Sequence, residues 1–321
     1  VEREEKIRRF VPRDYWEVKA EFVCSAGFYE GRWYDPKFKR DEFDPEKRDS
    51  RLWSLPAAET IVAACRGQIG TVTEESKPST QLSPALFDLT SLQREANGRF
   101  GFSAKNTLGL AQALYERHKV LTYPRTDARA LPEDYIETVK STLDMLKESN
   151  NYLPFAKQVL DKGWVKPNKR IFDNSKISDH FAIIPTLQAP KALSEPEQKL
   201  YDLVVKRFLA VFFPAAEFKV TTRITEVVGH HFKTEGKVLV EPGWLQIYGR
   251  EIGGEDANLV PVQKDEKVKT DRIAAHQLVT KPPARYNEAT LLSAMEGAGK
   301  LVEDDELREA MAAKGLGTPA T

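Results

Sequence analysis

The chain of 321 residues has only two cysteines, Cys24 and Cys65, and neither belongs to a CxxC pair or lies near a set of histidines. A zinc-binding module needs closely spaced Cys or His ligands, so the sequence predicts no zinc site. Two isolated cysteines are typical of a reduced, cytoplasmic protein, in which they act as small buried hydrophobic residues.

The chain also lacks long apolar runs and a net charge. No apolar stretch approaches the roughly 18 to 20 residues that span a bilayer, and no secretory signal opens the sequence. We therefore expect a soluble protein without a membrane partner. The 48 basic side chains balance 48 acidic ones, so global charge indicates no nucleic-acid partner. Residues 83–213 hold 19 Lys and Arg against 15 Asp and Glu, a surplus that is more often a solvated surface than a binding face.

A phosphate-binding loop for ATP is absent as well. Residues 297–300 (GAGK) resemble part of one, but Ala294 stands where its first glycine belongs and Leu301 where Ser or Thr belongs. The sequence therefore predicts no ATP site.

What the chain does contain is a helical block between two β-rich flanks. Alternating aromatic and β-branched residues predict strands in four stretches, which are 15–29 and 67–73 before the block, and 217–228 and 231–240 after it. The charged run 35–51 is expected to be a loop between strands, and 249–266 another.

Helix start signals and apolar stripes predict the helices of the block. Ser83-Pro84 marks a helix that ends near Asn97-Gly98, and Ser103 caps one that runs to about His118. Pro132 opens a third, and a capping box at 194–197 opens a fourth. A helical block joined at both ends to a β domain predicts an inserted domain, which is a candidate moving part.

One segment of the block, 121–129 (LTYPRTDAR), sets a tyrosine hydroxyl beside cationic groups. Pro124 biases Tyr123 toward an extended backbone, in which residues two apart share a side. Tyr123, Arg125 and Asp127 are therefore predicted to face one substrate together. A tyrosine that attacks a phosphodiester must lose a phenolic proton with an unperturbed pKa of about 10, and it needs a cation at the phosphorus. A lone Tyr-Pro pair is more often part of a turn than of a catalytic site, so the assignment of Tyr123 as a nucleophile depends on the other segments of the chain.

A second segment, 178–186 (SDHFAIIPT), places His180 beside a carboxylate. A neighbouring carboxylate favours the cationic form of histidine, which can hold a phosphate oxygen or protonate a leaving one. An isolated histidine is more often a hydrogen-bonded structural residue. That is our interpretation of the four others, which are His118, His230, His231 and His276.

The chain closes on a third segment, 314–321 (KGLGTPAT), after a predicted helix at 303–314. Thr318-Pro319 has the pattern of a cap and first position of a new helix, whose free N–H groups suit a phosphate. Because the sequence stops there, and residues 1–10 resemble the end of a charged helix, we expect a fragment.

LTYPRTDAR, SDHFAIIPT and KGLGTPAT, in this order, resemble the type IA DNA topoisomerases, and the proline after the tyrosine is more similar to the topoisomerase III branch than to topoisomerase I. Residues 86–108 (LFDLTSLQREANGRFGFSAKNTL) and 282–300 (PPARYNEATLLSAMEGAGK) agree, so the resemblance covers essentially the whole chain.

The resemblance implies an α+β, multidomain fold. A β-rich arch, the topoisomerase fold, would comprise 1–82 and 214–275. The insert 83–213 would be a helical domain that carries the catalytic tyrosine, is similar to a winged helix and lifts away to pass a DNA strand. Residues 276–321 would be part of a helical DNA-binding domain.

The resemblance also implies site residues. Tyr123 would form a 5′-phosphotyrosyl bond with single-stranded DNA, Arg125 would steady the scissile phosphate, and His180 would assist at the phosphate or the leaving oxygen. The further positions expected to bind DNA are Asp127, Ser178, Thr186 and Thr318. Resealing would need no ATP, because the tyrosyl phosphodiester conserves the free energy of the broken bond.

The family's Toprim domain, which carries an acidic residue and the carboxylates for Mg²⁺, has no counterpart in this sequence. We therefore expect Mg²⁺ only in the intact enzyme, no metal bound by this fragment, and no relaxation of supercoils by the fragment alone. We expect a monomeric, cytoplasmic, nucleoid-associated protein with the Toprim domain in cis. The alternative is a non-catalytic single-stranded DNA-binding or structural module in which Tyr123 only stacks or packs; Arg125 and His180 in matching contexts favour the enzyme.

Overall fold

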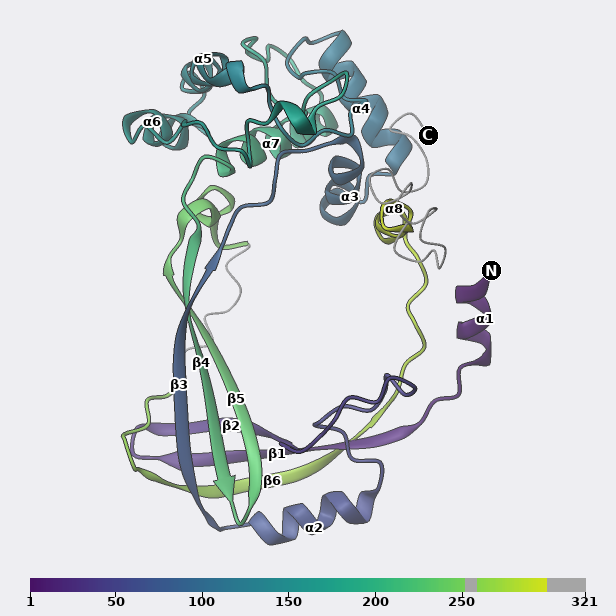
Figure 1. Cartoon of the computed structure of the whole chain (residues 1–321), viewed down its shortest axis with the longest axis vertical. Coiled ribbons are helices and arrows are strands. Elements are labelled where there is room, and N and C mark those ends of the chain that lie inside the picture. The colour runs from purple at the N-terminus through teal and green to yellow at the C-terminus, as the bar shows by residue number, and fades with distance from the viewer. Residues whose placement is uncertain (252–258, 299–321) are drawn as a thin grey trace. The chain divides into compact units, whose positions relative to one another are not determined.

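The structure is a computed structural model that describes residues 1–251 and 259–298 of the chain. The described residues form two compact units (Figure 1). The barrel unit contains Val1–Gln81, Glu217–Glu241 and residues 259–285, and the helical unit contains Leu82–Ala216 and residues 242–251 and 286–298. No helix in the described part of the chain combines the length and the apolar character that crossing a membrane requires.

Six strands of the barrel unit close into a barrel in the order β1-β2-β5-β4-β3-β6 (Figure 1). Their bounds are β1 (Asp14–Cys24), β2 (Gly27–Tyr34), β3 (Ile69–Gln81), β4 (Ala216–Val227), β5 (His230–Glu241) and β6 (Lys267–Val279). Sequence patterning predicted 15–29 as one strand, but it forms β1 and β2, because residues 25 and 26 make a tight turn between them.

The barrel core follows from side chains that alternate along β1. Val18, Ala20 and Phe22 are buried, whereas their neighbours are more exposed. The Phe22 ring lies 5.4 Å from the rings of both Tyr29 and Phe232. A Cβ atom at Gly31 would lie 3.0 Å from the Phe22 ring and 3.1 Å from Phe232, so glycine is needed for this close packing.

Two helices accompany the barrel, α1 (Glu2–Arg9) and α2 (Leu55–Cys65). The charged α1 was predicted from its sequence and is confirmed. Sequence patterning missed α2, which packs Ile61, Val62 and Cys65 into the barrel core. The charged run 35–51 therefore leads from a strand to a helix, not from one strand to the next.

The helical unit is built around α7 (Glu195–Ala210), whose apolar side chains are almost all buried. The other helices are α3 (Leu89–Phe100), α4 (Ala104–Glu116), α5 (Ile136–Leu146), α6 (Leu153–Asp161) and α8 (Glu288–Glu296), with short 3-10 turns at η1 (Glu133–Tyr135), η2 (Asn174–Lys176) and η3 (Gly243–Glu251). Burial of one apolar stripe on each helix supplies most of the stability of such a bundle.

Several helix starts agree with the sequence signals. Ser103 caps α4 and Ser194 opens α7 with a capping box, as predicted. The helix expected from Ser83-Pro84 begins later, at Leu89, because Phe87 pairs with Ile183 in an extended bridge and Asp88 supplies the cap. The helix predicted at 303–314 lies outside the described residues.

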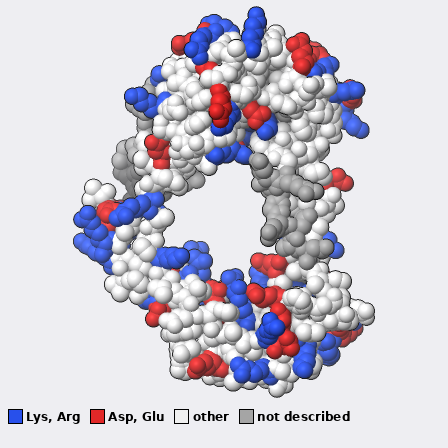
Figure 2. Space-filling view, turned by 180° about the vertical axis from the view of Figure 1, so that it is seen from behind, with Lys and Arg blue, Asp and Glu red and all other residues white. Residues whose placement is uncertain are grey.

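The boundary expected between 275 and 276 falls inside β6, whose pairing with β1 continues to Val279. Figure 2 shows basic and acidic side chains interspersed over the face in view. This mixture agrees with the balance of 48 basic and 48 acidic side chains.

Candidate active site

The tyrosine motif (residues 121–129) and the histidine motif (residues 178–186) lie side by side in the helical unit and are paired in antiparallel direction. The Thr122 N–H donates to the Ile184 carbonyl at 3.0 Å, the Thr186 N–H donates to the Val120 carbonyl at 3.0 Å, and Leu121 bridges Pro185. This register continues to Thr126, whose hydroxyl donates to the His180 carbonyl at 3.2 Å. Backbone pairing therefore brings residues about 60 positions apart into one site.

Exposure alternates along the tyrosine motif. Pro124, Thr126 and Ala128 are buried, whereas Tyr123, Arg125 and Arg129 are partly exposed and Asp127 is exposed. The side chains of Tyr123, Arg125 and Asp127 thus share the outward side, as the extended backbone predicted. The buried residues anchor the segment, and the outward ones remain accessible to a substrate.

Tyr123 lies between two aromatic rings. Its ring centroid is 4.3 Å from that of His180, at an interplanar angle of 45°, and 5.4 Å from that of Tyr115, at 78°. The imidazole is exposed, and the phenol ring is half-buried. The histidine and the tyrosine can therefore act on one phosphate without a large movement.

Arg125 is held by α4. With the Gln112 amide turned so that its oxygen faces the guanidinium, Gln112 accepts hydrogen bonds from Arg125 Nε and Nη2, each at 3.1 Å. Gln112 and Tyr115 are three residues apart on α4 and share one face of the helix. One helix face therefore orients both the guanidinium and the phenol.

Asp127 and Ser178 come together at the exposed edge of the paired segments. Ser178 Oγ donates to Asp127 Oδ1 at 3.5 Å, which is the long end of the hydrogen-bond range. His180 forms no ion pair with the adjacent Asp179 among the described residues, although the sequence suggested one. The chain bends at residues 178–180, and the His180 ring packs on Tyr123 instead.

Arg129, which the sequence analysis did not select, ends the same outward row. Its Nε donates to Asp88 Oδ2 at 2.7 Å, and its Nη2 donates to Glu296 Oε1 at 2.6 Å. Burial opposes the charge, but the two carboxylates outweigh it and raise the pKa of Arg129.

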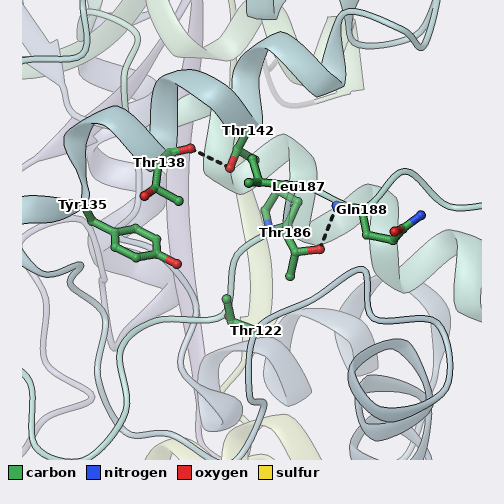
Figure 3. Close-up of a pocket in the computed structure, with 8 residues that line it drawn as sticks. Thr122, Tyr135, Thr138, Thr142, Thr186, Leu187 and Gln188 are labelled. Carbon is green, nitrogen blue, oxygen red and sulfur yellow. Dashed lines mark hydrogen bonds between the residues drawn. The ribbon is translucent and has the colours of Figure 1, made fainter.

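Thr186 does not join the Tyr123–His180 contact. Its hydroxyl donates to the Lys119 carbonyl at 2.7 Å and accepts from the Gln188 N–H at 3.1 Å. Thr186 and Thr122 line a separate pocket of about 430 Å³, opposite Tyr135, Thr138 and Thr142 (Figure 3). Because Thr122 precedes Tyr123 in an extended segment, this pocket lies on the side of the segment opposite the Tyr123 side chain.

Thr318 lies outside the described residues. Within the residues that the structure describes, no group of three or more His, Cys, Asp or Glu is arranged to hold a metal ion. Both cysteines are buried in the barrel unit, and burial raises the pKa of the Cys65 thiol to about 11.

Sequence reasoning thus identified Tyr123, Arg125 and His180 but missed Gln112 and Tyr115. The helix that carries these two was predicted, and their spacing of three residues was visible. The sequence did not show which face of this helix meets the tyrosine motif, because that depends on how α4 packs against α7 and the extended segments.

Comparisons with known proteins agree with the motifs. A family model described as DNA topoisomerase matches residues 1–321. DNA topoisomerase 3 of Bacillus cereus is 40% identical over 332 residues, covering 99% of this chain and 44% of that protein. DNA topoisomerase 3 of Bacillus subtilis is 37% identical over 331 residues, covering 99% of this chain and 44% of that protein.

Among solved structures, topoisomerase I from Thermotoga maritima has a similar fold, with a TM-score of 0.67 and 22% identity over 100% of this chain and 47% of that chain. The chain spans less than half the length of these relatives. The family match over every residue, together with the similarity to the Bacillus proteins, shows that the chain belongs to the DNA topoisomerases, in the type IA, topoisomerase III branch.

Proposed function

We propose that the chain is part of an ATP-independent topoisomerase that cuts and rejoins single-stranded DNA through Tyr123. The ring contact between Tyr123 and His180, at 4.3 Å, is the observation that carries this proposal. The two residues come from distant parts of the sequence, and no packing need requires a tyrosine and an exposed histidine at this point. A tyrosine and a histidine that act on one phosphate, in contrast, must lie this close together.

The proposed reaction is a transesterification. Tyr123 Oη attacks the phosphorus, the bond from phosphorus to the 3′ oxygen breaks, and a 5′-phosphotyrosyl bond forms while the other fragment leaves with a 3′-hydroxyl. Arg125, oriented by Gln112, would neutralise charge on the pentavalent phosphorus. His180 would hold a phosphate oxygen or supply the proton that the 3′ oxygen needs. The reverse reaction reseals the strand.

Mg²⁺ does not fit the described residues, because they contain no cluster of ligands for it. We propose that the carboxylates for Mg²⁺ belong to a Toprim domain of the complete protein.

We further propose that the helical unit is the winged-helix-like domain that lifts to pass a strand, and that the barrel unit belongs to the arch. The chain from α8 on, with Thr318, would contribute to a DNA-binding domain, and α8 packs on α3 of the helical unit. A monomer that works with its Toprim domain on the nucleoid in the cytoplasm completes the proposal. Support comes from the family membership and from the motifs, whose Asp127, Ser178 and Thr186 lie on or beside the paired segments.

The second candidate, a module that binds single-stranded DNA without chemistry, is favoured by one observation. The clustered rings of Tyr115, Tyr123 and His180, which meet edge-to-face and at a tilt, offer aromatic faces on which bases could stack, at about 1 to 3 kcal/mol for each base. This alternative leaves Arg125 and its support by Gln112 unexplained.

Trapping on end-labelled DNA tests the proposal. The complete protein that contains this chain is incubated with single-stranded DNA and quenched with denaturant. Label at the 3′ end should remain attached to the protein, and label at the 5′ end should be released, because the tyrosine keeps the 5′ phosphate. Tyr123→Phe should abolish attachment.

Tyr135→Phe is the matched control, since this tyrosine packs against Phe181 at 4.9 Å and lines the separate pocket. It should still attach the label. Attachment by the Tyr123→Phe protein would refute the assignment, and loss of attachment only in Tyr115→Phe would move the nucleophile to that residue.

A further inference from the structure

Two arginines of the helical unit share one carboxylate. Arg94 Nη1 donates to Glu296 Oε2 at 2.5 Å, and Arg129 Nη2 donates to Glu296 Oε1 at 2.6 Å. The arginines come from α3 and from the end of the tyrosine motif, whereas Glu296 is the last residue of α8. All three side chains are 36% to 41% exposed, so the cluster lies at the surface of the unit.

The arginine of the tyrosine motif is oriented without α8. Asp88 caps α3 by accepting from the Ser91 N–H at 2.7 Å, and its second oxygen accepts from Arg129 Nε at 2.7 Å. Asp88 is buried and fixed by the helix start, so it holds the guanidinium with Nη2 directed toward Arg94 and Glu296. A guanidinium that is positioned in advance loses little rotamer freedom when it binds a ligand.

Two guanidinium groups at one point repel each other unless an anion lies between them. A phosphodiester offers two non-bridging oxygens, as the carboxylate of Glu296 does, and arginine forks bind either group. The side chain of Arg129 also lies on the outward side of the segment that bears Tyr123 and Arg125. A DNA strand that follows this segment from Tyr123 would reach Arg129.

We propose that Arg94 and Arg129 form a second binding site for a backbone phosphate of single-stranded DNA, distinct from the scissile phosphate, and that Glu296 occupies it here in place of the phosphate. The proposal rests on the proposed function, because it concerns the same DNA strand. The site opens when Glu296 withdraws from the two arginines. DNA and the end of α8 therefore compete for one pair of cations.

The experiment measures the affinity of the 321-residue chain for a fluorescein-labelled oligothymidylate by anisotropy at several salt concentrations. All variants carry Tyr123→Phe, so that no covalent step contributes. Glu296→Gln removes the competing charge and should tighten binding about two- to fivefold, the range expected when an exposed ion pair no longer competes. The slope of log affinity against log salt should steepen by about 0.7, as expected for one further phosphate.

Glu288→Gln is the matched control, because it lies on the same helix and changes the net charge equally. Within residues 1–251 and 259–298, the one hydrogen-bond partner of the Glu288 carboxylate is the N–H of Ala104, at 2.6 Å. It should leave affinity and slope near those of the parent. Adding Arg94→Gln to Glu296→Gln should cancel the gain, and Arg94 has no other partner among the described residues whose loss would unfold α3.

Equal effects of Glu296→Gln and Glu288→Gln on DNA affinity would overturn the proposed site. A gain in affinity that persists when Arg94→Gln is added to Glu296→Gln would overturn it too. Melting curves of each variant separate these outcomes from loss of folding. Failure of the proposed function would appear differently, as absence of covalent attachment with the binding difference intact.

Discussion

Each unit buries an arginine against an aromatic ring, and the helical unit also presents Arg125 and Arg129 on the accessible side of the tyrosine motif. In the barrel, Arg223 is 1% exposed, lies 4.3 Å over the Tyr29 ring and donates to Glu74 at 2.9 and 2.8 Å. In the helical unit, Arg207 lies 4.0 Å over the Phe87 ring and pairs with Glu95. Both arginines are structural, because their positions inside the protein leave no room for a substrate.

Arg125 and Arg129 differ from these in exposure and in partners. Gln112 supports the former through a neutral amide, which leaves its charge for a ligand, and Arg129 is held by one buried and one exposed carboxylate. Residue type alone therefore does not separate the buried, structural arginines from Arg125 and Arg129. The two kinds differ in whether a ligand can replace the group that holds the guanidinium.

The largest expected effect tests the buried cation of the barrel. Glu74→Gln removes the carboxylate that pairs with the buried Arg223 guanidinium. Because the Glu74 side chain is 38% exposed and water can partly replace it, the free energy of unfolding should fall by about 2 kcal/mol. Urea denaturation measures this change. Glu75→Gln, on the same strand, changes a carboxylate that forms an exposed ion pair with Lys77, and it should have little effect. Equal losses in the two variants would show that Arg223 does not depend on its partner.

A smaller effect on stability is expected in the helical unit, where the buried charged group is the carboxylate of Glu197 and not a guanidinium. Burial of the Glu197 carboxylate opposes its ionisation, but hydrogen bonds from the Ser194 N–H and hydroxyl, both at 2.8 Å, and interactions with His118 and Arg117 outweigh it and lower the pKa to about 2. A lowered folded-state pKa stabilises the protein above the unfolded-state value, and the contribution is lost as pH falls from about 5 toward 2.

We expect this contribution to be about 1 to 2 kcal/mol, because Arg117 is exposed and solvent screens its charge. Unfolding followed by circular dichroism from pH 7 to pH 3 measures it, and Glu197→Gln should flatten the profile over that window. Glu195→Gln, on the same helix but at the surface, should leave the profile unchanged. A slope that Glu197→Gln does not alter would contradict the assignment.

The smallest effect on stability should accompany a large effect on the proposed chemistry. Gln112→Ala removes the support of Arg125 from a partly exposed helix position, so the free energy of unfolding should change by less than about 0.5 kcal/mol. Attachment of 3′-labelled DNA in the complete protein should slow by roughly tenfold, because a misplaced guanidinium stabilises the phosphorus less well. Gln198→Ala, on the exposed side of α7, is the control for a helical Gln-to-Ala change. Unchanged attachment in the Gln112 variant would remove this residue from the site.

Much of the candidate site could be predicted from short-range sequence features. Proline after Tyr123 indicated an extended backbone, and the alternation that follows from it agrees with the exposure pattern, in which Arg125 and Asp127 are accessible and Thr126 is buried. Helix caps were predicted best where a side chain bonds its own helix, as at Ser103 and Ser194. The start of α3 was misplaced, because the bridge from Phe87 to Ile183 depends on a segment almost a hundred residues away.

The sequence by itself determined the family, the candidate nucleophile and the alternating exposure around it, since these depend on residue identity and on backbone preferences over a few residues. Only the tertiary structure decided that His180 touches Tyr123, that Gln112 holds Arg125, and that Arg94 and Arg129 meet at Glu296. Such contacts join segments whose separation in the chain carries no periodic signal, and they form because the packing of the helices around α7 leaves each segment one place to lie.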